Sequence, residues 1–220
     1  MIQPKPNYPS GTIPYEQQLD ADFEWALREG SMHFDENNAV HKTLRRVTKR
    51  LEELGVPYAV AGGMALFFHG YRRFTEDVDI LVSRDSLKVI HENLEGLGYL
   101  PPFRGSKNLR DTEFGVKIEF LVSGDYPGDG KPKPVSFPDP AEAGTEIHGI
   151  RFLSLEKLIE LKLASGLTNP RRGQDLVDVQ NLIEHLQLPE DFALRLNPFV
   201  QNKFRELWNI LRSNPKPADE

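Results

Sequence analysis

The stretch that decides the fold spans residues 61–82 and reads AGGMALFFHGYRRFTEDVDILV. It begins where a short apolar segment meets Gly62 and Gly63, and it ends in the β-branched run 77–82. This pattern predicts a strand, a tight turn, a short helix over 64–69 and a second strand. Glycines at the turn leave backbone N–H groups open to an anion, because they have no Cβ. An ordinary strand-to-helix turn has the same sequence pattern.

Two aspartates occupy alternate positions of the second strand. Because side chains alternate between the faces of a strand, Asp77 and Asp79 point to one face and their apolar neighbours to the other. Their Cα atoms lie about 6.6 Å apart, so both carboxylates can reach a pair of divalent cations. Unpaired aspartates are costly in an interior strand, and like charges repel without a cation between them. An exposed acidic edge is the alternative interpretation.

A third acid, Glu119, lies on the predicted strand 116–122. It is the polar residue in the otherwise apolar second half of that strand, IEFLV. If this strand lies beside 77–82, Glu119 points to the same face as the two aspartates. A solvent-facing glutamate on a half-exposed sheet fits the pattern equally well.

The rest of the chain predicts an α/β core followed by a helical C-terminal part. We expect a partly disordered arm over 1–34, the core over 35–153, the helical part over 154–213 and a tail over 214–220. In the arm, Phe23, Trp25 and Leu27 could dock on the body. Apolar periodicity predicts the further elements, which are helices over 38–54, 87–97, 155–165, 174–186 and 198–212 and a hairpin over 145–153.

Composition excludes several classes of protein. The chain has 27 basic and 33 acidic residues, and the net charge of -6 argues against a protein wrapped in nucleic acid. The absence of cysteine removes disulfides, thiolate nucleophiles and Cys-zinc sites. The longest apolar run is too short for a membrane span and no secretory signal is visible, so we expect a cytoplasmic protein without membrane contact.

The glycine pair, the two aspartates and Glu119 together resemble the nucleotidyltransferase superfamily with the DNA-polymerase-β-like fold, a small mixed sheet flanked by helices. Its signature is a Gly-Gly or Gly-Ser turn, a helix, Asp-x-Asp on the next strand and a third acid on a later strand. Within it, the chain is most similar to the small bacterial AbiEii-type toxins of abortive-infection and toxin–antitoxin systems. The third acid of the family is usually aspartate, and glutamate reaches one methylene further. The resemblance covers residues 38–186 and rests on the runs 61–82, 151–165 and 171–179.

The resemblance implies Mg²⁺-dependent transfer of a nucleoside monophosphate from a nucleoside triphosphate, such as ATP, to an acceptor hydroxyl. For a toxin-like enzyme the acceptor is RNA or tRNA, and an antitoxin protein is the expected partner. Asp77, Asp79 and Glu119 would hold two Mg²⁺ ions, and Glu119 would also hold or deprotonate the acceptor. Gly62 and Gly63 would cradle the β- and γ-phosphates. A triphosphate cannot approach three carboxylates without divalent cations.

Three further residues are candidates for nucleotide binding. Arg73 could clamp a phosphate through two N–H groups, and Thr75 could orient Asp77, although a solvated loop with an Arg–Asp pair is the alternative. Lys162 falls on the apolar stripe of its helix, where a lysine is costly unless it is paired or faces a cleft. It could therefore bind triphosphate, pair with an acid of the next helix, or extend its ammonium to solvent.

Two other functions fit the same residues. One is a non-catalytic module of the same fold that binds a nucleotide or a partner, and the other is a nucleotidyltransferase for a small molecule of the antibiotic type. The shape of the cleft separates the acceptors, because tRNA needs an open basic rim and a small molecule an enclosed pocket. The best candidates for RNA contact, with a solvated face as the alternative, are Lys42, Arg45, Arg46, Lys49 and Arg50.

Overall fold

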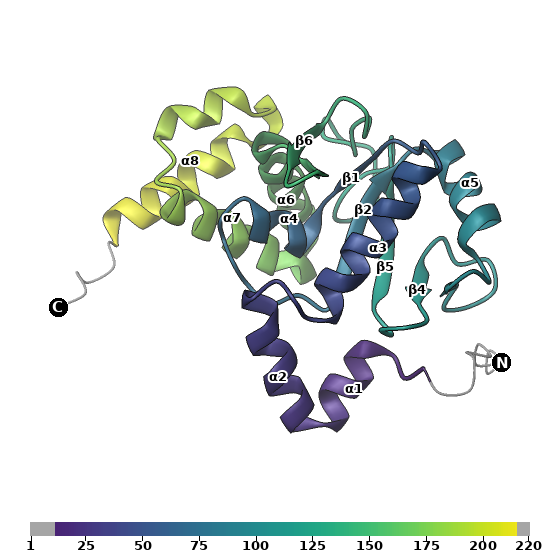
Figure 1. The fold of residues 1–220 in the computed structure, drawn as a ribbon. Coiled ribbons are helices and arrows are strands. Elements are labelled where there is room, and N and C mark those ends of the chain that lie inside the picture. Colours follow the sequence, from purple (N-terminus) through teal and green to yellow (C-terminus); the bar gives the residue numbers. More distant parts are fainter. Residues whose placement is uncertain (1–11, 215–220) are drawn as a thin grey trace.

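The computed structural model describes residues 12–214 and contains one mixed sheet flanked by helices (Figure 1). Its seven strands follow the order β3-β4-β5-β2-β1-β7-β6. This architecture confirms the predicted α/β class. The strands are β1 (Tyr58–Val60), β2 (Asp77–Val82), β3 (Tyr99–Leu100), β4 (Leu109–Asp111), β5 (Lys117–Val122), β6 (Gly144–Ile147) and β7 (Ile150–Leu153).

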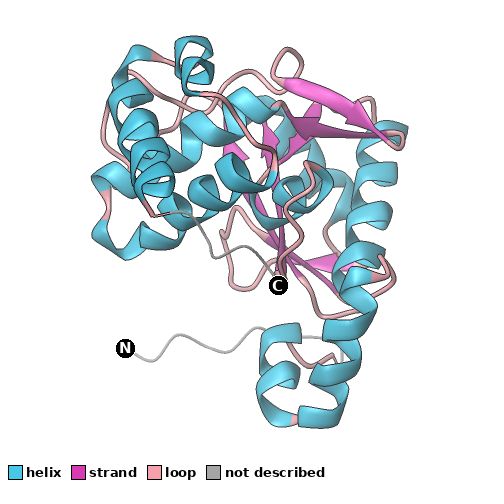
Figure 2. Cartoon of the chain, turned by 90° about the vertical axis from the view of Figure 1, so that its left-hand side faces the viewer, coloured by secondary structure: helices cyan, strands magenta, loops and turns pink. Residues whose placement is uncertain are grey.

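Helices precede, connect and follow the strands (Figures 1 and 2). No helix in residues 12–214 has the length and apolar character that a membrane span requires. Two short 3₁₀ helices flank α7, at Pro170–Arg172 and Glu190–Arg195. The α-helices are α1 (Tyr15–Ala21), α2 (Phe23–Phe34), α3 (Ala39–Glu53), α4 (Gly62–Phe68), α5 (Arg84–Leu94), α6 (Leu155–Thr168), α7 (Gly173–His185) and α8 (Pro198–Ser213).

Strands β2 and β5 lie at the centre of the sheet and run parallel. The residues of one face, Val78 and Ile80 on β2 and Ile118 and Phe120 on β5, are fully buried. Burying side chains of this size contributes about 1.5–3 kcal/mol each. Helix α3 packs on β2 and helix α5 on β5, while α6, α7 and α8 pack on one another. The other face of β2 and β5 is left for the predicted site residues.

The structure shifts the helix predicted over 87–97 to Arg84–Leu94 and adds two strands. Helix α5 ends at Leu94 instead of continuing to residue 97, and Leu97 is 68% exposed. Gly96 adopts a positive φ of 81°, which turns the chain toward β3. Strands of two or three residues such as β3 and β4 are too short to show period-2 alternation, so the sequence did not predict them. The predicted hairpin is confirmed by the antiparallel pairing of β6 with β7.

The expectation of a loose N-terminal arm is wrong for residues 15–34, which form α1 and α2. Tyr15 is fully buried, and its backbone N–H donates to the carbonyl of Gly115 at 3.0 Å. Trp25 packs edge-on against Tyr15, as expected of a docked residue, but Phe23 and Leu27 are 75% and 58% exposed and do not dock. Residues 1–11 of the arm and 215–220 of the tail lie outside the described residues.

The close contact between Gly115 and the chain that enters α1 predicts that a side chain at position 115 destabilises the fold. This glycine has a φ of 70°, and a Cβ on it would lie 2.3 Å from the backbone oxygen of Ile13. We expect Gly115→Ala to lower the free energy of unfolding by about 2 kcal/mol or more, measured by urea denaturation. Gly105→Ala is the matched control, because Gly105 has a φ of 81° but nothing within 4 Å of its Cβ position. Equal losses in the two variants would contradict this prediction.

Candidate active site

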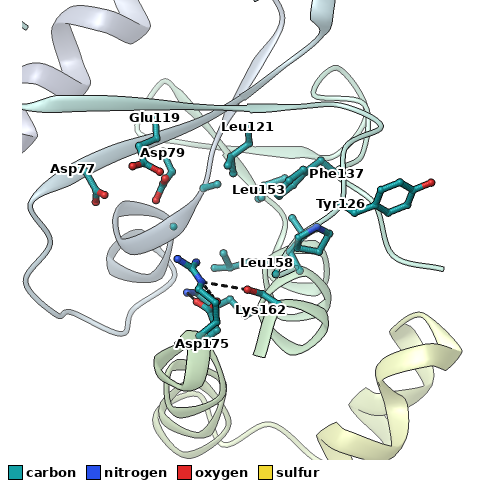
Figure 3. Close-up of a pocket in the computed structure, with 17 residues that line it drawn as sticks. Asp77, Asp79, Glu119, Leu121, Tyr126, Phe137, Leu153, Leu158, Lys162 and Asp175 are labelled. Atoms are coloured by element: carbon teal, nitrogen blue, oxygen red, sulfur yellow. Dashed lines mark hydrogen bonds and ion pairs between the residues drawn. The ribbon is translucent and has the colours of Figure 1, made fainter. Parts of the chain in front are cut away.

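Three carboxylates meet on the open face of β2 and β5 (Figure 3). One oxygen from each of Asp77, Asp79 and Glu119 lies within 4.8 Å of the others. Pairing of the parallel strands produces this cluster, because Asp79 stands opposite Glu119 and Asp77 opposite Lys117. The cluster needs two conditions. Side chains must alternate along each strand, as the sequence predicts, and the two strands must be neighbours.

The two glycines are required by the site itself. Gly62 has a φ of 59°, and a Cβ there would lie 1.7 Å from Oδ2 of Asp79. A Cβ on Gly63 would lie 2.6 Å from Oγ1 of Thr75. The Thr75 hydroxyl in turn donates a hydrogen bond of 2.9 Å to Oδ1 of Asp77, which confirms the predicted orienting contact. Because Gly62 and Gly63 have no side chains, Asp79 and Thr75 can lie directly against the first residues of α4.

Like charges and burial dominate the electrostatics of this cluster. Burial, with the neighbouring charges of Asp77 and Glu119, raises the pKa of Asp79 to about 8. Burial also raises the pKa of Asp77, and the charge of Glu119 adds to that effect. Lys117 forms an ion pair with Glu119 at the edge of the cluster. In the absence of a cation, the folded chain therefore holds a proton on each of the two aspartates more readily than the unfolded chain does.

A second charged network faces the cluster from α6 and α7. The buried ammonium of Lys162 donates to Asp175 at 3.0 Å and to Asp178 at 2.7 Å, so it pairs with the next helix and does not extend to solvent. Arg73 binds both oxygens of Asp178, at 2.9 and 3.0 Å. The two N–H groups that could clamp a phosphate thus bind a carboxylate of the chain. This is the Arg–Asp pair that the sequence analysis gave as the alternative. This network fixes the segment that precedes β2 against the C-terminal helices.

Arg172 is a residue of this site that the sequence analysis missed. Its Nε donates to Asp175 at 2.9 Å, its side chain is 58% exposed, and it lies in the walls of both cavities beside the carboxylates. Its charge opposes the raised pKa of Asp79. The pair Arg171-Arg172 follows a proline between two helices and has no periodic pattern, so nothing in the sequence signals its place.

Two adjoining cavities open at the cluster and share Gly62, Asp77, Asp79 and several residues of the charged network. The first has a volume of about 350 Å³, and Figure 3 shows its aromatic and aliphatic wall. The second, of about 360 Å³, has a basic wall. The apolar wall of the first includes Leu121, Tyr126, Phe137, Leu153 and Leu158, and the basic wall of the second includes Arg73, Arg171 and Arg172.

Comparisons with known proteins add a resemblance in backbone arrangement. No family model and no curated protein matches the sequence. Among solved structures the chain is similar to ANT(2")-Ia in complex with adenylyl-2"-tobramycin, with 14% identity over 78% of this chain and 96% of that chain and a TM-score of 0.47.

Two other solved structures are similar to the chain. One is a protein from Thermotoga maritima proposed to be a nucleotidyltransferase, with 21% identity over 64% of this chain and 91% of that chain and a TM-score of 0.43. The other is a tRNA nucleotidyltransferase complexed with a primer tRNA and an incoming ATP analog, with 16% identity, coverage of 79% and 64%, and a TM-score of 0.34. Similarity this distant assigns no activity, so any function has to follow from the site.

The raised pKa of Asp79 predicts that its charge destabilises the metal-free fold. In the unfolded chain this carboxyl has a pKa of about 3.9, so its own contribution to stability is fully present below about pH 4 and is lost as the pH rises toward 8. We expect Asp79→Asn to be more stable than the wild type at pH 8 in EDTA by about 1.4 kcal/mol or more, the equivalent of one pKa unit. The gain should vanish near pH 4, and thermal denaturation across this range measures it.

A matched control for this prediction is Asp85→Asn, because the side chain of Asp85 is 94% exposed. This control should change stability by less than about 0.5 kcal/mol at either pH. A variant Asp79→Asn that loses stability at pH 8 would contradict the proposed electrostatic strain.

The buried ion pairs of Lys162 predict a large loss on truncation. Lys162→Ala leaves Asp175 and Asp178 without their shared buried cation, and breaking such a pair costs about 3–5 kcal/mol. Lys88→Ala, which removes an exposed ion pair with Asp85, should cost less than about 1 kcal/mol. Chemical denaturation of both variants checks the contrast, and similar losses would contradict the prediction.

Proposed function

We propose that this chain is an Mg²⁺-dependent nucleotidyltransferase that moves a nucleoside monophosphate from a nucleoside triphosphate to an acceptor hydroxyl. The observation that supports it most is the cluster of Asp77, Asp79 and Glu119, whose oxygens lie within 4.8 Å of one another. Carboxylate oxygens suit hard divalent cations. Burial raises the pKa of both aspartates and the neighbouring negative charges add to that effect, and a bound cation would offset both.

Each residue of the cluster has a role in this reaction. Two Mg²⁺ ions would neutralise the triphosphate and stabilise the attacking and leaving oxygens. Asp77 and Asp79 would hold them, and the hydrogen bond from Thr75 keeps Asp77 in position. Glu119 would take the proton of the acceptor hydroxyl while the acceptor oxygen bonds to the α-phosphorus. The bond from that phosphorus to the bridging oxygen breaks, and pyrophosphate leaves.

The phosphates have a basic wall available to them. Lys162 and Arg172 lie beside the cluster in both cavities. Together with Arg73 and the backbone of Gly62 and Gly63, they are our candidates for contact with the β- and γ-phosphates. Arg73 would contribute from its pair with Asp178, and Arg172, whose side chain is 58% exposed, from its pair with Asp175.

RNA is the first acceptor class to test, in line with the sequence resemblance. On α3, Lys42, Arg45 and Lys49 form no salt bridge within residues 12–214, and a nucleic-acid backbone could meet them. Arg46 and Arg50 are instead paired with acids of the chain, which reduces the basic face predicted from the sequence. The toxin–antitoxin assignment and the antitoxin partner remain predictions from the resemblance.

A small hydroxylated molecule is the second candidate acceptor. The cavity with the apolar wall, about 350 Å³, has the size and lining of a small-molecule site. Tyr126 and Phe137 come from the long loop 123–140, and Figure 3 shows their side chains on one side of this cavity. An aromatic wall of this kind packs on a ring system of the ligand.

Loss of the two aspartates should abolish transfer. Purified protein is incubated with labelled nucleoside triphosphates and Mg²⁺, with total RNA or a panel of hydroxylated small molecules as acceptors. Asp77→Asn with Asp79→Asn should lower the rate more than about 100-fold, because changes even outside the ligand sphere cost 10–100-fold. Asp85→Asn serves as the control. Equal label transfer by the double variant and the wild type would disprove the assignment.

The same preparations test the non-catalytic alternative. Calorimetry measures triphosphate binding with Mg²⁺ and with EDTA. Binding that needs Mg²⁺ and is lost in the double variant agrees with the proposed enzyme. Tight binding in EDTA, with no transfer to any acceptor, would favour a nucleotide-binding module of the same fold.

A further inference from the structure

Helix α2 presents an apolar stripe to solvent. Phe23, Leu27 and Phe34 are 75%, 58% and 47% exposed. With Gly30 they occupy positions i, i+4, i+7 and i+11, which fall on one face of a helix. Nothing lies within 4 Å of the Cβ position of Gly30, so the middle of the stripe is open. We call these four residues the α2 stripe.

The opposite side of α2 is fixed to the body, so the stripe cannot turn inward. Glu29 accepts hydrogen bonds from the hydroxyl of Tyr15 at 3.0 Å and from the backbone of Ala39 at 2.9 Å. His33 is fully buried, and its Nε2 lies 3.0 Å from the carbonyl oxygen of Arg73. The helix is therefore held in a defined orientation, with its apolar stripe outward.

Acidic residues surround the α2 stripe. Residues 12–36 contain seven acids and one basic residue, so the whole formal charge of -6 lies in this segment and the rest of the sequence is balanced. Asp20, Glu24 and Asp35 are exposed and form no salt bridge within residues 12–214. Such a surface repels RNA and anionic lipid. It also disfavours pairing with a second copy, because two acidic segments would meet.

We propose that the α2 stripe is the docking surface for an amphipathic helix of another protein that carries Lys or Arg beside its apolar face. Phe23 and Phe34 would serve as aromatic anchors, Gly30 would let the two helices approach closely, and the surrounding acids would pair with the basic flank. Figures 1 and 2 show α1 and α2 projecting from the body, where a partner helix has access. This inference does not depend on the proposed catalytic activity.

Helix α2, which carries the stripe, contacts the segment that leads into the candidate active site. His33 contacts the backbone of Arg73, and Glu36, just after α2, pairs with Arg72 at 3.7 Å. Both arginines belong to the segment that leads directly into Asp77. A helix on the α2 stripe would thus pack on the element that supports this segment.

The test uses the full chain and two synthetic helical peptides of 18 residues. One has a leucine face flanked by lysines, and the other has the same face flanked by glutamates. Binding is measured by fluorescence anisotropy of the labelled peptides. Three variants are compared with the wild type: Phe23→Ser with Leu27→Ser for the stripe, Asp20→Asn with Glu24→Gln for the acids, and Phe103→Ser with Leu194→Ser for exposed apolar residues elsewhere.

We expect the lysine peptide to bind the wild type and the Phe103 and Leu194 variant equally. The stripe variant should bind at least about tenfold more weakly, a change of about 1.4 kcal/mol. The acid variant should bind more weakly and with less dependence on salt. All substituted side chains are exposed, so circular dichroism melts should be unchanged.

Three results would overturn the proposal. Binding of the lysine peptide that is unaffected in the stripe variant would show a general attraction to acidic surface. Absence of binding to the wild type, or preference for the glutamate peptide, would show that the stripe does not take a basic helix. A dimer in analytical ultracentrifugation that is lost in the stripe variant would assign the surface to a second copy of the chain.

Discussion

Parallel pairing of β2 with β5 is the interaction on which the rest of the structure depends. It places Asp79 opposite Glu119. Asp77 lies two residues before Asp79 on β2 and points to the same side, so three carboxylates share one face of the sheet. The opposite face of the same strands is fully buried. Hydrophobic burial on that face therefore fixes a cluster of like charges that would otherwise separate. A bound cation would relieve this repulsion, and the proposed metal-dependent transfer rests on that property of the cluster.

The surroundings of the cluster serve this arrangement at short range. Gly62 and Gly63 have no side chains because the carboxylate of Asp79 and the hydroxyl of Thr75 occupy the space. On the other side of the cavities, Lys162, Arg73 and Arg172 form ion pairs with acids of α7 and also line the cavity wall. Negative charge on the sheet thus faces positive charge on the helices. A ligand with phosphates and divalent cations matches that division of charge.

The N-terminal helices add a separate element to the core. Their inner side is bound through Tyr15, Glu29 and His33, whereas their outer side is acidic and apolar at once. The net charge of the whole chain says little about the surface of the core. All of the excess negative charge lies in residues 12–36, and the rest of the sequence is balanced. The proposed partner surface on α2 and the candidate site on β2 and β5 therefore lie on different elements of the chain.

The sequence by itself determined the α/β class, the strands that carry the three acids, and which side chains share a face, because alternation along a strand is a local property. It also predicted the contact from Thr75 to Asp77, two residues away. Tertiary structure alone decided that β5 lies beside β2, that Lys162 and Arg73 converge on Asp178, and that Arg172 reaches the cavities. These contacts join residues far apart in the chain, so no local pattern encodes them.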